Sequence, residues 1–395
     1  SPAPPAPDLP VGGRWIDLGA HDTTLRYGEF GAERLTGSGT LTMTGGRMGF
    51  WETAPLSELG ALRMEGGILV MPNLSVGAFH WSGGGFGGYS PSSGNGWTEV
   101  TGNATITGSG SRSGAAFTFA DHTVWDSAGF ITSPGYVRIT AGAQFEDRAE
   151  GSSHTWRVGG LEHLIDGRYT KSGSGASTWQ VTRGTDFTNR GTVDVQAGQL
   201  TWTVGTPDEY LSGDGASVWT NHGTLRTSGG ALRVELIDAQ ATHSGQMEVE
   251  TGSVSFSLRD TDLVSTGGWR IARTGVLRLS GSPEQSMRST VDLQQGRMTN
   301  QGLLAIENIR VRFAPSATLE GVGDVTVDGQ GTLEYGGGAL ALHTLRIGNG
   351  EATPGHVQVA GGLALQSLSW GHAALAAGGP ITVQGQALLN GYAVD

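Results

Sequence analysis

Pairs of acidic residues are the strongest candidates for catalytic groups in this chain. Asp260 and Asp262 lie two residues apart, and Asp324 and Asp328 lie four apart. Glycosidases need two carboxyl groups about 5–10 Å apart across the bond that they cleave. Residues two apart on a β-strand share one face at about 7 Å, so Asp260 and Asp262 could form such a pair. The alternative is that these acids lie on a solvated outer face, where charge discourages aggregation.

A polysaccharide lyase would also need basic residues beside acids that bind calcium. Arg310 and Arg312 share one predicted strand, but no acidic motif accompanies them in the sequence. Calcium could bind at Asp324 with Asp328, or at Asp208 with Asp214, although no D-x-[DN]-x-[DN]-G loop is present. We therefore expect no metal site and no cofactor, with calcium as the alternative.

Other kinds of catalytic site are excluded by residue types. The chain has no Cys, so cysteine nucleophiles, disulfides and cysteine-ligated metals are impossible. Lys171 is the only lysine and it follows Thr170, whereas a Walker A loop needs Gly-Lys before Ser or Thr. The ten His residues show no paired spacing typical of metal ligands.

The aromatic residues fall into two groups by position. Trp156, Trp179 and Trp202 recur 23 residues apart, which predicts stacking in a core. Residues 77–97 instead have the composition of a long Gly/Ser loop. Exposed aromatic rings there could stack on sugars or contact a partner, although they could equally cover one end of a repeat structure. The candidate binding residues in this segment are Trp81, Phe86, Tyr89 and Trp97.

A repeat must position all of these residues. It has the form G-x-h-x-h-x-x-G-x-h-x-h, in which h is apolar, and its period is close to 22 residues. Such a period is typical of solenoid architectures. The copies begin at Gly39, Gly60, Gly135, Gly191, Gly223 and Gly245.

Each copy predicts two short strands joined by a corner. Alternation of period two places the apolar side chains on one face, and Gly supplies positive φ at the corner. One coil cannot bury that face alone, but stacked coils bury it and pair their backbones with the coils above and below. The sequence thus predicts an all-β, single-stranded parallel β-helix, or β-solenoid, with about 22 residues per coil. We assign residues 1–10 to a Pro-rich arm and 11–395 to the solenoid, with loops inserted at about 77–97, 205–218 and 280–295.

Two ladders of equivalent positions follow from this prediction. The first starts with Trp156 and Val158. It continues through Trp179 and Val181, Trp202 and Val204, Val234 and Leu236, Phe256 and Leu258, Leu277 and Leu279, and Val311 and Phe313. The second contains Asn189, Asn221 and Asn300, each of which follows a Thr. These Asn side chains could stack and hydrogen-bond along the axis, or each could simply tolerate a turn and cap its own backbone.

Charge and hydropathy exclude several kinds of partner. The net charge is −12 and the basic residues are scattered, so binding to nucleic acid is not expected. No apolar run has the length of a membrane-spanning helix. The Pro-rich start, Ser1 to Pro5, resembles a mature end exposed by processing, and the absence of Cys suits an extracellular bacterial solenoid. We therefore expect secretion or display at a bacterial cell surface.

Several stretches resemble the repeats of bacterial extracellular β-helix proteins, namely adhesins, haemagglutinin-like proteins and autotransporter passengers. They are residues 170–175, 187–200, 242–252 and 319–325. The resemblance covers residues 165–335 best. It implies a right-handed β-helix that is secreted or surface-displayed and serves in adhesion or as a scaffold.

The leading hypothesis is therefore a non-enzymatic structural or adhesive protein. It would display loops, or assemble into a filament or a larger surface structure through Trp15, Ile16 and Leu18. Its partner would be another copy of itself, or a glycan or protein of a host or cell surface. The alternative is a polysaccharide lyase or glycoside hydrolase on the same scaffold, with Asp260, Asp262, Asp324 and Asp328 as its candidate residues.

Overall fold

Parallel β-strands make up all the regular structure that is described for this chain. The computed structural model describes residues 15–50, 56–70, 73–87, 97–113, 116–133, 135–150, 154–159, 162–206, 215–282, 288–348, 354–371 and 373–389. These residues contain strands and no helix. The chain divides into two compact units, Ser1–Thr182 with Asp208–Ser212, and Arg183–Pro207 with Gly213–Asp395.

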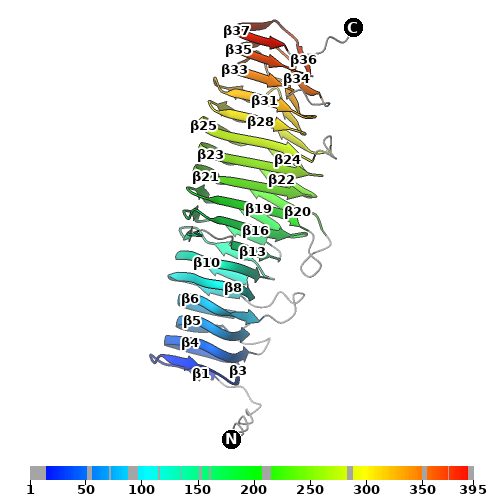
Figure 1. Ribbon diagram of the computed structural model, residues 1–395. Helices are drawn as coiled ribbons and strands as arrows, with labels where there is room; N and C mark the ends of the chain where they lie inside the picture. The colour runs from blue at the N-terminus through cyan, green and yellow to red at the C-terminus, as the bar shows by residue number, and fades with distance from the viewer. Residues whose placement is uncertain are drawn as a thin grey trace. The chain divides into compact units, whose positions relative to one another are not determined.

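The first unit contains strands β1 to β16, stacked coil on coil (Figure 1). Their bounds are β1 Trp15–Asp17, β2 Thr23–Leu25, β3 Glu29–Ala32, β4 Arg34–Phe50, β5 Ser57–Val70, β6 Asn73–Gly87, β7 Trp97–Val100, β8 Ala104–Ser113, β9 Ala116–Phe119, β10 His122–Ser133, β11 Val137–Ile139, β12 Gln144–Asp147, β13 His154–Val158, β14 Glu162–Ile165, β15 Arg168–Lys171 and β16 Ala176–Thr182.

The second unit contains strands β17 to β37, stacked in the same way. Their bounds are β17 Asp186–Asn189, β18 Thr192–Val195, β19 Gln199–Thr206, β20 Ser217–Asn221, β21 Thr224–Ile237, β22 Ala239–His243, β23 Gln246–Arg259, β24 Asp262–Ser265, β25 Gly268–Gly281, β26 Thr290–Leu293, β27 Arg297–Asn300, β28 Leu303–Glu307, β29 Arg310–Phe313, β30 Thr318–Glu320, β31 Asp324–Asp328, β32 Thr332–Tyr335, β33 Leu340–Ile347, β34 Gly355–Val359, β35 Leu363–Trp370, β36 Ala373–Ala377 and β37 Ile381–Leu389.

Strand register confirms the predicted β-solenoid. Thr224, Gln246 and Gly268 begin three parallel strands and lie in register, so each coil returns after 22 residues. Side chains along the strands alternate between the buried core and the outer surface, as in the pattern BiBiB of β13. A strand inside the stack therefore pairs its backbone with the coils on either side and buries one of its two faces.

The tryptophan ladder is confirmed at its start. Trp156 and Trp179 occupy the same register position on β13 and β16, and both are buried. Their ring centroids lie 5.5 Å apart at an interplanar angle of 37°. Trp202 lies in the second unit, in register with Val234, which is in turn in register with Phe256.

Two later steps of the ladder were predicted wrongly. Phe256 pairs with Leu279 rather than Leu277. The reason is that the register between β23 and β25 shifts by one residue after Val249. Val311 and Phe313 belong to a different column, since β29 pairs with β26 and not with β28. Both strands of a coil carry the same apolar alternation, so the pattern alone did not distinguish them.

The predicted loop at 77–97 is wrong over its first half. Residues 77–87 belong to β6, and residues 88–96 lie outside the described residues. The glycine run is a coil corner: Gly84 has φ +71°, and an added Cβ would lie 2.6 Å from the carbonyl oxygens of Gly66 and Gly67. Only glycine accommodates both this conformation and this close approach. The same corner is occupied by Gly67, with φ +73°.

The other expected insertions are described only at their edges. In the segment 205–218, residues 207–214 lie outside the described residues and β20 begins at Ser217. In the segment 280–295, residues 283–287 lie outside them, and β26 spans Thr290–Leu293. The predicted arm, residues 1–10, also lies outside the described residues.

The asparagine ladder is correct for two of its three members. Asn189 and Asn221 lie in register on β17 and β20, and both are fully buried. Nδ2 of Asn189 donates to Oδ1 of Asn221 at 2.6 Å. Asn300 instead lies in register with Ile271, on another column of the coil.

Candidate functional site

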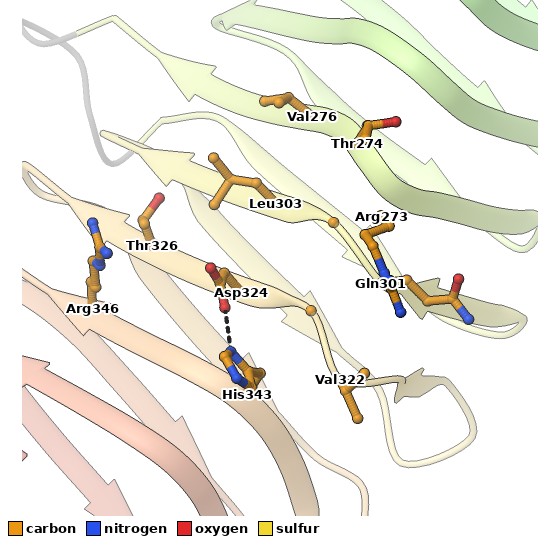
Figure 2. A pocket seen from close by; sticks show the side chains of 13 residues that line it. Arg273, Thr274, Val276, Gln301, Leu303, Val322, Asp324, Thr326, His343 and Arg346 are labelled. Atoms are coloured by element: carbon orange, nitrogen blue, oxygen red, sulfur yellow. Dashed lines mark hydrogen bonds and ion pairs between the residues drawn. The ribbon is translucent and has the colours of Figure 1, made fainter. Parts of the chain in front are cut away.

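A groove of about 510 Å³, open to solvent, lies on the second unit. It crosses four successive coils, at the middle of β25, the starts of β28 and β31, and the second half of β33 (Figure 2). Its lining combines apolar and small residues with polar side chains that project into solvent. The polar residues are Arg273, Thr274, Gln301, Asp324, Thr326, His343 and Arg346, and the others are Gly275, Val276, Gly302, Leu303, Val322 and Gly323.

Glycines at the coil corners shape this groove. A Cβ on Gly302 would lie 2.3 Å from the carbonyl oxygens of Ala272 and Gly275, and one on Gly323 would lie 2.5 Å from Oδ1 of Asn300. The corners therefore carry no side chain that could fill the depression. Asn300 braces them, because its Nδ2 donates to the carbonyl of Asp324 at 3.0 Å and its Oδ1 accepts from the amide of Gly302 at 3.1 Å.

A carboxylate and an imidazole face each other in the groove. Oδ1 of Asp324 on β31 lies 3.2 Å from Nδ1 of His343 on β33, as Figure 2 shows. Their side chains are 45% and 58% exposed, so a ligand in solution can reach both. Because a carboxylate only accepts hydrogen bonds, this contact assigns the proton to Nδ1. Nε2 of a neutral His343 is then free to accept a hydrogen bond or a proton.

Arginine and amide groups surround this pair. Arg273 and Arg346 are both exposed and form no ion pair with any described residue. Both can therefore bind an anionic or polyhydroxylated ligand through the planar guanidinium group. Among the described residues that line the groove, Asp324 is the only one with a carboxylate.

The structure places the first predicted acidic pair outside this groove. Asp260 has φ +47° at a coil corner, and its Oδ1 lies 3.8 Å from Nη1 of Arg288. Oδ1 of Asp262 accepts from the backbone amide of Thr290 at 2.9 Å and from its hydroxyl at 2.6 Å. These contacts link one coil to the next, which gives both acids a structural role.

The second predicted pair is split by the structure. Asp324 lines the groove, whereas Asp328 lies at the other end of β31 and does not. The arginine cluster considered for a lyase is also elsewhere: Nε of Arg310 lies 3.4 Å from Glu334, and Arg312 follows on the same strand, β29. None of the described residues forms a group of three or more His, Cys, Asp or Glu that could hold a metal ion.

Two of the four candidate aromatic binding residues are core residues. Trp81 and Phe86 are 0% and 2% exposed, and their rings meet edge to face at 5.4 Å. Placing them on a binding surface was therefore wrong. Trp97 begins β7 and is half-buried, and Tyr89 lies outside the described residues.

The three residues predicted to mediate assembly lie at the start of the first unit. Trp15 is 70% exposed, and the guanidinium of Arg34 lies 5.2 Å from the centre of its ring. Ile16 pairs with Leu35, and the amide of Leu18 donates to the carbonyl of Thr36 at 2.7 Å. All three positions are thus tied to β4, and Trp15 alone presents a large free apolar surface.

Sequence reasoning missed His343, Arg273, Gln301 and Arg346. The available signal was the coil period, because His343 follows Asp324 by 19 residues, close to one coil. Aligning polar residues by coil, rather than along one strand, would have brought Asp324 and His343 together.

The comparisons with known proteins identify no relative. No family model, no curated protein and no solved structure matches the chain. Within the described residues, no helix could cross a membrane.

Proposed function

We propose that this protein is a secreted or cell-surface β-solenoid with a structural and adhesive role, and that its groove binds a surface glycan. The observation that carries this proposal is a set of exposed polar groups contributed by three of the coils that line the groove. Arg273, Gln301, His343 and Arg346 are all exposed and surround the apolar side chains of Val276 and Leu303. Sugars offer hydroxyl groups for the polar rim and C–H faces for the apolar floor.

The groove favours binding over two-carboxylate hydrolysis. Glycosidases place two carboxyl groups across the scissile bond, one as acid and the other as nucleophile or base. Only Asp324 supplies a carboxylate among the described lining residues. The other predicted acids hold coils together or lie elsewhere, so a hydrolase site would lack its second group.

A polysaccharide lyase is the second candidate, and one contact favours it. Asp324 holds His343 through Nδ1, which leaves Nε2 free as a general base. Arg346 or Arg273 could neutralise a uronate carboxylate and thereby acidify the adjacent C–H bond. Such an enzyme would cleave an acidic polysaccharide by β-elimination.

The deciding experiment compares binding and turnover on the same glycans. Purified protein is screened against immobilised neutral and acidic polysaccharides, and Kd is measured for the wild type, Arg346→Gln and His343→Gln. Arg259→Gln is the matched control, because Arg259 is exposed on the same unit and lies outside the groove. We expect each groove variant to weaken binding at least about tenfold, the scale of one lost charged contact. Equal loss in Arg259→Gln, or no glycan bound by the wild type, would refute the proposal.

The lyase is tested in the same samples by the absorbance of the unsaturated product. Steady product formation that is lost in His343→Gln but retained in Arg259→Gln would establish the enzyme instead. Binding without any product would support adhesion.

A further inference from the structure

The only lysine of the chain is buried beside a buried aspartate. Lys171 and Asp147 end β15 and β12 at the same register position, and neither side chain has any exposed surface. Two buried rings lie in the same layer: Tyr169 and Phe145 stack with centroids 5.5 Å apart. Lysine is almost never fully buried, so this site calls for a specific explanation.

The contacts of Lys171 match those of a neutral amine. Its Nζ donates to the carbonyls of Ala149 at 3.2 Å and Gly173 at 2.5 Å. Oδ1 of Asp147 lies 3.8 Å away, beyond hydrogen-bonding distance. A neutral amine has two N–H groups, which these carbonyls satisfy, and its lone pair is then free. Burial lowers the pKa of Lys171, which favours this neutral form.

The carboxyl group of Asp147 is held by two donors. The hydroxyl of Tyr169 donates to Oδ2 at 2.6 Å, and the amide of Ala149 donates to Oδ1 at 3.1 Å. Donors in this arrangement withdraw electron density from the carboxyl carbon and stabilise negative charge that develops on its oxygens.

A buried imidazole lies on β13, the strand that follows β12 in the chain. His154 is 1% exposed, and its Nδ1 has no hydrogen-bond partner among the described residues. Burial lowers the pKa of this imidazole, so the ring stays neutral. Burying a nitrogen without a hydrogen-bond partner costs free energy, and the neutral Nδ1 is able to accept a proton.

We propose that Lys171 and Asp147 join in an amide bond between adjacent coils. In the reacting state Lys171 is a neutral amine and Asp147 is a carboxylic acid with its proton on Oδ1. Nζ attacks Cγ of Asp147, while the Tyr169 hydroxyl stabilises the charge that forms on Oδ2. The attacking nitrogen gives up its proton to Oδ1, the bond from Cγ to Oδ1 breaks, and one water molecule leaves. Enclosure of both groups favours this condensation, because it replaces a bimolecular step.

The mass of the folded protein tests the proposal directly. We expect the intact mass to be lower than the sequence mass by one water molecule. Trypsin should not cleave after Lys171, and residues 139–148 should appear joined to residues 169–183. Because Lys171 is the only lysine, an amine reagent should not label it after denaturation. A full sequence mass with a labelled Lys171 would overturn the proposal.

Two variants separate the reaction from simple packing. Asp147→Asn should form the same bond with loss of ammonia, so its linked product should match the linked wild type in mass. Tyr169→Phe keeps the ring and removes the donor, and we expect its linked fraction to fall at least tenfold. Normal linkage in Tyr169→Phe would contradict the assigned role of the hydroxyl. The glycan screen reports on a different unit, so the two proposals fail independently.

Discussion

Nδ2 of Asn221 donates to Nδ1 of His243 across adjacent coils at a distance of 2.8 Å. Asn221 also accepts from Asn189, so the three side chains form one buried column. Because Nδ2 can only donate, Nδ1 of His243 must be the acceptor and its hydrogen is on Nε2. Nε2 then points its hydrogen toward the carbonyl of Gly268, 3.5 Å away.

Interrupting this column should destabilise the second unit strongly. Asn221→Ala removes the acceptor of Asn189 and the donor to His243, and each unsatisfied buried group costs about 1–3 kcal/mol. We expect the free energy of unfolding to fall by about 2–5 kcal/mol, measured by urea denaturation. Thr242→Ala is the control, because its hydrogen bond to Thr220 is exposed. Equal stability of the two variants would show that the column contributes nothing.

Buried histidines should make the fold sensitive to acid. Burial lowers the pKa of His163 to about 3 and that of His243 to about 4, below the ordinary value of 6.5. As the pH falls, these histidines bind protons in the unfolded chain before they do so in the folded chain. The free energy of unfolding is therefore fully present above pH 6.5 and falls as the pH approaches 4 and 3. Each histidine contributes a slope of about 1.4 kcal/mol per pH unit in that window.

The acid sensitivity is measured by urea denaturation between about pH 7.5 and about pH 4.5. This range includes the pH at which the two histidines begin to destabilise the fold. His243→Asn continues the amide column without a titrating ring. We therefore expect it to reduce the slope of the unfolding free energy against pH by about 1.4 kcal/mol per pH unit, which corresponds to one proton. His222→Asn is the control, because the His222 side chain is exposed. A slope unchanged in His243→Asn would contradict the assigned source.

The fold could be predicted from the sequence because one pattern repeats with one period. The alternation and the corner glycines recur near every 22 residues, so errors in single copies did not change the result. The failures came where a coil gains one residue, as between Ile271 and Thr274, or where two strands of one coil look alike. The hydropathy pattern alone does not show where a residue is inserted, and it does not show which of the two strands of a coil a segment forms.

The candidate site was predictable only in part, for a related physical reason. Asp324 was found as an acidic residue on a strand, but its contacts come from other coils. The pairing of Asp324 with Asp328 assumed that neighbours along the strand share a site, whereas ligand surfaces on a solenoid run across coils. Trp81 and Phe86 were misplaced because the glycines beside them form a corner and not a loop.

Stacked tryptophans should dominate the stability of the first unit. Trp179 is 1% exposed, and its ring lies 5.5 Å from Trp156 and 5.6 Å from Tyr169. Trp179→Ala should lower the free energy of unfolding by about 3–5 kcal/mol, the usual loss for a large core side chain. Trp15→Ala, at a 70% exposed position, should change it by less than about 0.5 kcal/mol. Thermal and urea denaturation of both variants measure the difference.

Close approach between coils, rather than positive φ alone, should make the corner glycines irreplaceable. Gly67 and Gly142 have φ values of +73° and +86°, so alanine is strained by about 1–2 kcal/mol at either position. A Cβ at Gly142 meets nothing within 4 Å, whereas one at Gly67 would lie 2.6 Å from the carbonyl oxygen of Gly45. We therefore expect Gly67→Ala to cost at least about 2 kcal/mol more than Gly142→Ala, because the coils must separate to admit the methyl group. Urea denaturation of the two variants measures this difference within one unit. If they lose the same stability, backbone conformation alone accounts for the glycines, and the contact between coils adds no further constraint.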